Sequence, residues 1–153
     1  MYDVGSMTAM GRTGNGQAVR ATIGFAVRGD GEGVAYARLA DLQKGEGLVR
    51  ERFWCRPQPA LRGRNVAYGA LAAVARALLA RGLRCVRFEI EDADLVRDLV
   101  ERRALPGALT VPYITLRCAL NRFSEATVAV AGEGVVRDLT ARARAESSLN
   151  VAA

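Results

Sequence analysis

The side chains that could do chemistry in this sequence are carboxylates and arginines, because the chain contains no histidine. That absence removes the commonest general base, the Ser–His and Cys–His nucleophile pairs, and every histidine-containing metal site. The most suggestive carboxylate is Asp92, which follows a predicted strand. Asp92 also has a structural interpretation, because with Asp94 it stands where a helix would begin, and carboxylates there offset the helix dipole and cap free N–H groups. Glu89 and Glu91 alternate along the preceding strand, and two carboxylates on one strand do not make a two-metal site.

A second group of candidates is a set of arginines close together in the sequence, beside the predicted edge of a sheet. They are Arg50, Arg52, Arg56, Arg62 and Arg64. Arginines that converge in this way could track a phosphate backbone, and we select Arg50, Arg52, Arg62 and Arg64 as candidate nucleic-acid-binding residues. The alternative is a charged, solvent-exposed strand face, which the interspersed Glu46 and Glu51 favour.

The composition bounds the possible partners and the class of protein. A chain of 153 residues with 50% hydrophobic and 25% charged residues predicts one globular domain with a real core. The formal net charge of +6 permits an acidic partner such as nucleic acid, although an arginine-rich solvated surface would give the same balance. Trp54, Tyr36 and Tyr68 could stack on bases, but we expect them in the core and its rim.

The cysteines and the hydropathy pattern predict a location. Cys55, Cys85 and Cys118 are odd in number and widely separated, so we expect reduced core thiols rather than disulfides or a zinc site. The sequence shows no signal-peptide pattern at residue 1 and no uncharged run of membrane-spanning length. We therefore expect a cytoplasmic protein without membrane contact.

Alternating and helical patterns predict the elements that must position these side chains. Strands are expected over residues 21–27, 34–39 and 48–56, joined by Gly-rich turns at 29–33 and 44–47 as an antiparallel meander. A helix over 66–80 is apolar or small at nearly every position except Arg76, so it should be buried on most sides.

The ends of this helix and the elements after it complete the predicted order. Asn65 is a plausible N-cap and Gly82 a natural C-terminal cap. The strand expected over 85–90 then requires a right-handed crossover and a parallel pairing with the first strand. The remaining predicted elements are helices over 93–102 and 112–122, a strand over 126–131 and a helix over 135–145. The resulting order is β-β-β-α-β-α-α-β-α in an α/β (α+β, mixed-sheet) domain.

Three short motifs in this order resemble the ribonuclease H-like superfamily, in particular the compact bacterial and reverse-transcriptase-associated forms. Asn65 through Leu71 resembles the family's Asn-x-Ala-Glu-Tyr-x-Ala-Leu helix start, and residues 92–96 resemble its Asp-Ser-x-Leu-Val strand end. The Leu-x-x-Phe pattern before the last strand is matched by residues 120–123. The resemblance spans residues 21–145 and implies a ribonuclease H-like fold.

The family's chemistry uses four carboxylates around two magnesium ions, and this sequence departs from that pattern. Asp92 matches the carboxylate at the end of the fourth strand and is the candidate catalytic and metal-binding residue. Ala67 replaces the helix glutamate in the register fixed by Tyr68. The first strand has no aspartate, since Asp30 lies beyond it in a Gly-Asp-Gly turn. Asp138 lies near the family's last aspartate, but matching the following leucine puts Arg137 there, a cation that would repel magnesium.

The resemblance therefore implies a catalytically impaired domain that binds RNA, DNA or an RNA–DNA hybrid through arginines and needs no cofactor. Two alternatives stay open. One is an active ribonuclease H that cleaves RNA–DNA hybrids with Mg²⁺ or Mn²⁺ held by Asp30, Asp92 and Asp138 together with Glu91 or Glu89. The other is a non-catalytic protein-interaction module. We expect a flexible leader over residues 1–17, the domain over 18–146 and a flexible tail over 147–153, and the sequence does not give the oligomeric state.

Overall fold

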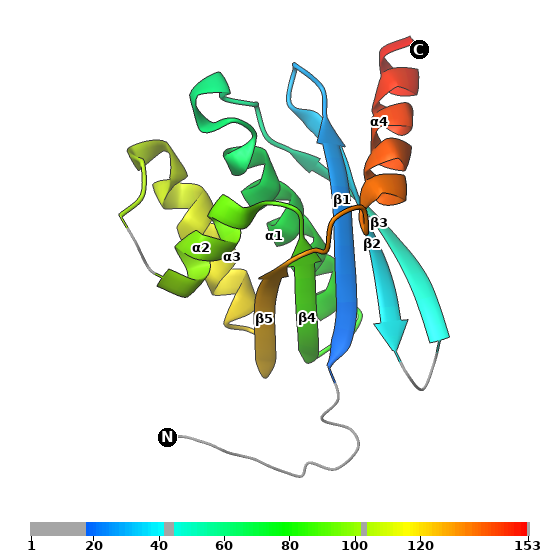
Figure 1. Cartoon of the computed structure of the whole chain (residues 1–153), viewed down its shortest axis with the longest axis vertical. Coiled ribbons are helices and arrows are strands. Elements are labelled where there is room, and N and C mark those ends of the chain that lie inside the picture. Colours follow the sequence, from blue (N-terminus) through cyan, green and yellow to red (C-terminus); the bar gives the residue numbers. More distant parts are fainter. Residues whose placement is uncertain (1–17, 42–44, 102–103, 153) are drawn as a thin grey trace.

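A five-stranded mixed sheet with helices on both faces forms the frame of the computed structural model, which describes residues 18–41, 45–101 and 104–152 (Figure 1). The strand order across the sheet is β3-β2-β1-β4-β5. The strands are β1 (Val19–Val27), β2 (Glu32–Asp41), β3 (Gly45–Trp54), β4 (Cys85–Ile90) and β5 (Glu125–Val130).

The strand pairing confirms the predicted topology. β1 pairs antiparallel with β2, and β2 pairs antiparallel with β3, which gives the meander. β4 lies parallel to β1, with Ile23 opposite Ile90, and β5 lies parallel to β4. The crossover through a helix therefore joins β3 to β4 as the sequence predicts.

Helices cover the two faces of the sheet unequally. Three lie on one face, and α4 packs alone against β1 and β2 on the other (Figure 1). The α-helices are α1 (Arg64–Ala80), α2 (Ala93–Glu101), α3 (Thr110–Leu120) and α4 (Arg137–Ala152), and short 3-10 turns precede α1 (η2, Pro59–Leu61) and α3 (η3, Gly107–Leu109). None of the helices in the described ranges is long and apolar enough to cross a membrane.

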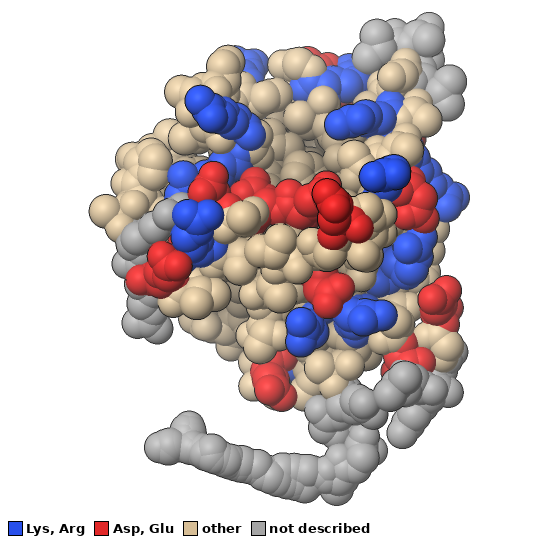
Figure 2. Space-filling view, viewed as in Figure 1, with Lys and Arg blue, Asp and Glu red and all other residues tan. Residues whose placement is uncertain are grey.

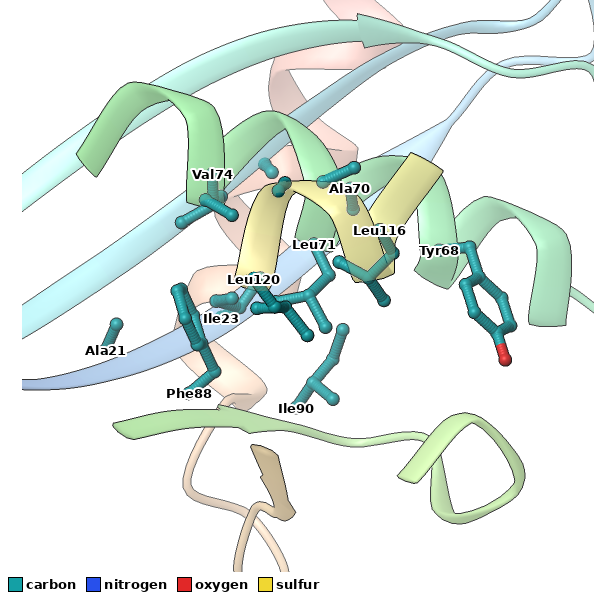
Figure 3. Close-up of a cluster of buried hydrophobic side chains, with 14 of the residues drawn as sticks. Ala21, Ile23, Tyr68, Ala70, Leu71, Val74, Phe88, Ile90, Leu116 and Leu120 are labelled. Carbon is teal, nitrogen blue, oxygen red and sulfur yellow. The ribbon is translucent and has the colours of Figure 1, made fainter. Parts of the chain in front are cut away.

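The main core lies between the sheet and α1, as the apolar sequence of that helix predicts. Leu71 and Val74 of α1 meet Ile23 of β1 and Phe88 of β4, and α3 adds Leu116 (Figure 3). These side chains are fully buried. A smaller cluster under α4 joins Val34 and Tyr36 of β2 to Leu139 and Ala143.

Several boundaries differ from the predicted ones. The N-cap of α1 is Gly63, with φ 84°, so the prediction of Asn65 as N-cap was wrong. Asn65 lies inside the helix, where its Nδ2 donates a hydrogen bond to the Arg56 carbonyl at 2.8 Å. β3 already begins at Gly45, so residues 45–47 are strand rather than turn.

The C-terminal end of α1 was predicted correctly, but the end of the last helix was not. Gly82 has φ 83°, and the Leu83 N–H bonds the Leu78 carbonyl at 3.1 Å, which confirms a glycine-terminated helix. α4 runs to Ala152, past the predicted end at 145, so residues 147–152 belong to this helix and were wrongly assigned to a tail. The expected leader, residues 1–17, lies outside the described residues.

The cysteines and aromatic residues also test the sequence predictions. All three cysteines are free, but Cys118 is exposed and is therefore not a core thiol. Tyr36 and Tyr68 are buried as expected. Trp54 is 66% exposed, with its ring packed over Gly31 at the rim of the sheet.

The close approach of α4 to β1 depends on Gly24. A Cβ atom at this position would lie 2.6 Å from the Cβ of Leu139 and 2.6 Å from the backbone nitrogen of Thr140. We expect Gly24→Ala to lower the free energy of unfolding by about 1–3 kcal/mol, because α4 must move off the sheet. Urea denaturation measures this loss. Gly29→Ala is the control, since nothing lies within 4 Å of a Cβ there; equal stability of the two variants would contradict the prediction.

Candidate active site and nucleic-acid interface

Asp92 lies two residues after the end of β4 and acts as the N-cap of α2. Its Oδ1 accepts a hydrogen bond from the Leu95 backbone N–H at 3.0 Å. Burial raises the pKa of this carboxyl above its ordinary value, and the nearby Asp94 raises it further, while the Leu95 hydrogen bond and Arg64 act in the opposite direction. The structural interpretation of Asp92 as a helix cap is therefore confirmed.

The positions next to this strand end are apolar. Ile23 of β1 is opposite Ile90 of β4. Phe25 lies two residues beyond Ile23, on the same face of the sheet, and packs against the main core. Ala67, in the first turn of α1, is fully buried in that core. Phe25 thus lies near the end of β1, and Ala67 lies in the first turn of α1.

A buried polar cluster that the sequence analysis missed ties α1 to α2. Asp98 is fully buried and accepts two hydrogen bonds from Arg64, one of them from Nε to Oδ2 at 2.9 Å. The Tyr68 hydroxyl, which points away from the core in Figure 3, donates to the same Oδ2 at 2.8 Å. Burial and the carboxylate of Asp98 both raise the pKa of Tyr68. The available signal was Asp98 itself, a carboxylate three residues after Leu95 on the apolar face of α2.

The structure does not bring the three candidate carboxylates together. Asp30 caps its own turn, where its Oδ1 accepts the Glu32 N–H at 3.0 Å and Arg28 forms an ion pair with it. Asp138 pairs with Arg38 of β2 on the α4 face of the sheet. Each guanidinium lowers the pKa of the carboxyl that it contacts. Across residues 18–41, 45–101 and 104–152, no three His, Cys, Asp or Glu side chains are placed to hold one metal ion.

These residues do not fit the two-metal centre that the fold resemblance implies. Such a centre needs several carboxylates to offset the repulsion between its two cations. The structure supplies Asp92, whose oxygen caps α2, while β1 carries the apolar Phe25 near its end and α1 carries Ala67 in its first turn. Arg137, where the resemblance puts the last carboxylate, is an exposed cation at the start of α4.

Three of the four candidate arginines have carboxylate partners. Arg50 pairs with Glu146 of α4, and Arg52 lies 3.4 Å from Glu32 of β2. Arg64 is only 16% exposed and is held by Asp98. Arg62 is exposed, in a left-handed conformation just before α1.

The charge distribution on one face of the molecule is mixed. Figure 2 shows basic side chains along the upper rim of this face and a band of acidic side chains across its middle. Charges of both signs thus share this face, which is not one continuous positive surface. Arg56 is the last of the five arginines that lie close together in the sequence, and its Cζ lies 5.9 Å from the centroid of the Trp54 ring.

The fold has clear relatives among solved structures, although neither a family model nor a curated protein sequence matches the chain. It is similar to ribonuclease H1 from Halobacterium salinarum, with a TM-score of 0.70 and 16% identity over 88% of this chain and 99% of that one. The N-terminal RNase H domain of a Mycobacterium tuberculosis protein matches with a TM-score of 0.65 and 14% identity, over 89% of this chain and all of that domain. LC11-RNase H1, solved in complex with an RNA/DNA hybrid, matches with a TM-score of 0.59 and 10% identity, over 85% of this chain and 99% of that chain. The chain therefore has the ribonuclease H-like fold.

The burial of Asp92 predicts how stability depends on pH. The folded-state pKa lies above the ordinary value of 3.8, so ionisation of Asp92 costs stability as pH rises through that folded-state pKa. Asn caps helices as well as Asp does. We therefore expect the stability of Asp92→Asn relative to the wild type to rise as pH increases from the ordinary carboxyl value of 3.8 to above the folded-state pKa. Denaturant titrations at several pH values measure the difference. Glu125→Gln, which removes an exposed carboxylate at the opposite end of the parallel strands, is the control, and a relative loss with rising pH would refute this assignment.

Proposed function

We propose that this chain is a ribonuclease H-like domain that binds RNA, DNA or an RNA–DNA hybrid and does not cleave it. The observation that carries the non-hydrolytic part is that Phe25, near the end of β1, and Ala67, in the first turn of α1, stand where the resemblance puts carboxylates. Hydrolysis by two metal ions needs carboxylates at such positions, and the guanidinium of Arg64 already supplies positive charge near Asp92. The domain is in this sense a pseudoenzyme.

Restoring one carboxylate does not restore a metal centre. Ala67→Glu would place a charge in a fully buried position between α1 and the sheet, where an unpaired carboxylate is costly. Positions 25 and 137 would still carry phenylalanine and arginine in place of carboxylates. The active-nuclease alternative needs Asp30, Asp92 and Asp138 around Mg²⁺ or Mn²⁺, and the separate ion pairs of Asp30 and Asp138 oppose it.

The binding part of the proposal is supported by charge and by fold. The net charge of +6 favours association with a polyanion. LC11-RNase H1, which shares the fold, was solved with an RNA/DNA hybrid. Free cysteines agree with a reducing compartment, and we place this activity in the cytoplasm.

Three of the candidate arginines remain suited to phosphate contacts. Arg52 is 64% exposed, and an exposed ion pair such as the one it forms with Glu32 contributes only about 0–1 kcal/mol, so a phosphate can compete for it. Arg50 is 44% exposed, and a phosphate would share this side chain with Glu146. Arg62 is exposed as well. Arg64 is excluded from the proposed interface, because two hydrogen bonds bind it to the buried Asp98.

A protein-interaction module is the second candidate function. It is favoured by the pairing of Arg50, Arg52 and Arg64 with carboxylates, since paired and dispersed arginines do not form one positive surface. The same fold could carry both functions on different surfaces.

The binding proposal predicts a salt-dependent loss in the combined variant Arg50→Ala, Arg52→Ala and Arg62→Ala. Each lost phosphate contact should reduce the slope of log K against log salt by about 0.9 for a duplex. Fluorescence anisotropy with an RNA–DNA hybrid at two salt concentrations measures this change. The matched control replaces the exposed arginines Arg84, Arg122 and Arg144 with alanine, which removes the same charge elsewhere. Equal affinity of the two triple variants would disprove a specific arginine interface.

A further inference from the structure

The side of helix α1 that faces β3 is made almost entirely of small residues. The positions follow the spacing i, i+3, i+4, i+7, i+8 and i+11, which places them on one side of a helix. They are Gly69, Ala72, Ala73, Arg76, Ala77 and Ala80. Ala72 and Ala73 are buried, whereas Arg76 and Ala80 are exposed. This side of α1 lines a groove beside the edge strand β3, and Val111 of α3 borders one end of the groove.

Two adjoining cavities form this α1–β3 groove, and Arg76 lines both of them. One, of about 380 Å³, lies between Glu51 of β3 and the C-terminal half of α1, ending at Arg81. The other, of about 260 Å³, continues past Gly69 toward Phe53 and Trp54. At a rise of about 1.5 Å per residue, the stripe from Gly69 to Ala80 makes the groove roughly 17 Å long.

The Trp54 end of the groove is apolar and contains an unsatisfied polar atom. Trp54 is 66% exposed and Val111 of α3 is 71% exposed, so two large apolar side chains flank the opening. Asn65 lines the same cavity and is only 3% exposed, and its Oδ1 has no hydrogen-bond partner in the described part of the chain. This oxygen is enclosed by the protein, so Trp54 and Val111 are the side chains that this end offers to a ligand.

The charged side chains along the groove are mainly cationic. Arg76 and Arg81 are exposed, and neither forms an ion pair within the ranges that the structure describes. Glu51 is the acidic residue of the lining. The helix side of the groove thus combines small apolar residues with two cations, Arg76 and Arg81.

We propose that the α1–β3 groove docks an amphipathic helix of a partner protein that carries acidic residues along one edge. Glycine and alanine let a second helix approach α1 closely, and apolar side chains at i, i+3, i+4 and i+7 of that helix fill the two cavities. Its acidic edge pairs with Arg76 and Arg81. A nucleic-acid strand fits less well, because the alanine wall gives bases no stacking surface away from the Trp54 end, and Glu51 repels phosphate. This surface is separate from Arg62 and Asp92 and does not depend on the proposed nucleic-acid binding.

A peptide selection tests the proposal. A display library of randomised helical peptides is selected on the wild-type chain and counter-selected on Ala77→Gln, which fills the groove without adding charge. Enriched peptides are then measured by anisotropy. We expect an apolar stripe with Asp or Glu at its edge, and about a tenfold or larger loss of affinity with Ala77→Gln and with Arg76→Glu plus Arg81→Glu.

Matched variants separate docking from general effects on the fold or charge. Ala141→Gln makes the same change at an exposed alanine of α4, and Arg84→Glu plus Arg122→Glu makes the same charge change elsewhere; both should leave affinity unchanged. Circular dichroism confirms that each variant is folded. Failure to select peptides sensitive to Ala77→Gln, selection of basic or extended peptides, or displacement of the peptides by single-stranded DNA would each overturn the proposal.

Discussion

The structure depends on the burial of α1 against the sheet. Ala67, Ala70 and Leu71 are fully buried, so the helix packs closely over the sheet, mainly on β3 and β2. That contact orients the crossover from β3 to β4 and sets β4 parallel to β1. It also buries position 67 completely, where the resemblance to ribonuclease H would put a metal ligand. Other small residues of α1, between Gly69 and Ala80, line the groove along β3.

Polar contacts complete this packing where apolar contacts end. Arg64 and Tyr68 emerge one turn apart from the start of α1 and share the buried carboxylate of Asp98, which fixes α2 beside α1. Removing one partner of such a buried pair generally costs about 3–5 kcal/mol. On the opposite face, α4 is joined to the sheet by a small apolar cluster and by Arg50, Tyr36 and Glu146. The arginines of this chain therefore stabilise the fold to a large extent.

The sequence predicted the elements better than the site. Alternation and turn glycines locate the first three strands, and the apolar run of α1 with Gly82 locates the crossover, because these signals are local. The N-cap failed because Asn65 bonds back to Arg56 from inside the helix. The pairs Arg50–Glu146 and Arg64–Asp98 were missed because they join residues 96 and 34 positions apart, and spacing along the chain does not reveal such contacts. Asp92 was located correctly as a helix-start carboxylate, but the place of Phe25 near the end of β1 is defined only by the register of β1 on β4.

Hydrolysis of an RNA–DNA hybrid is the most direct test of the central claim, that an apolar strand end has replaced the metal centre of this fold. The assay compares the purified chain with Asp92→Asn in magnesium and in manganese, at protein concentrations that saturate the hybrid. The account predicts that both proteins leave the hybrid intact with either metal. Robust cleavage by the wild type that disappears in Asp92→Asn would show that Asp92 belongs to a working metal centre, and would contradict the account.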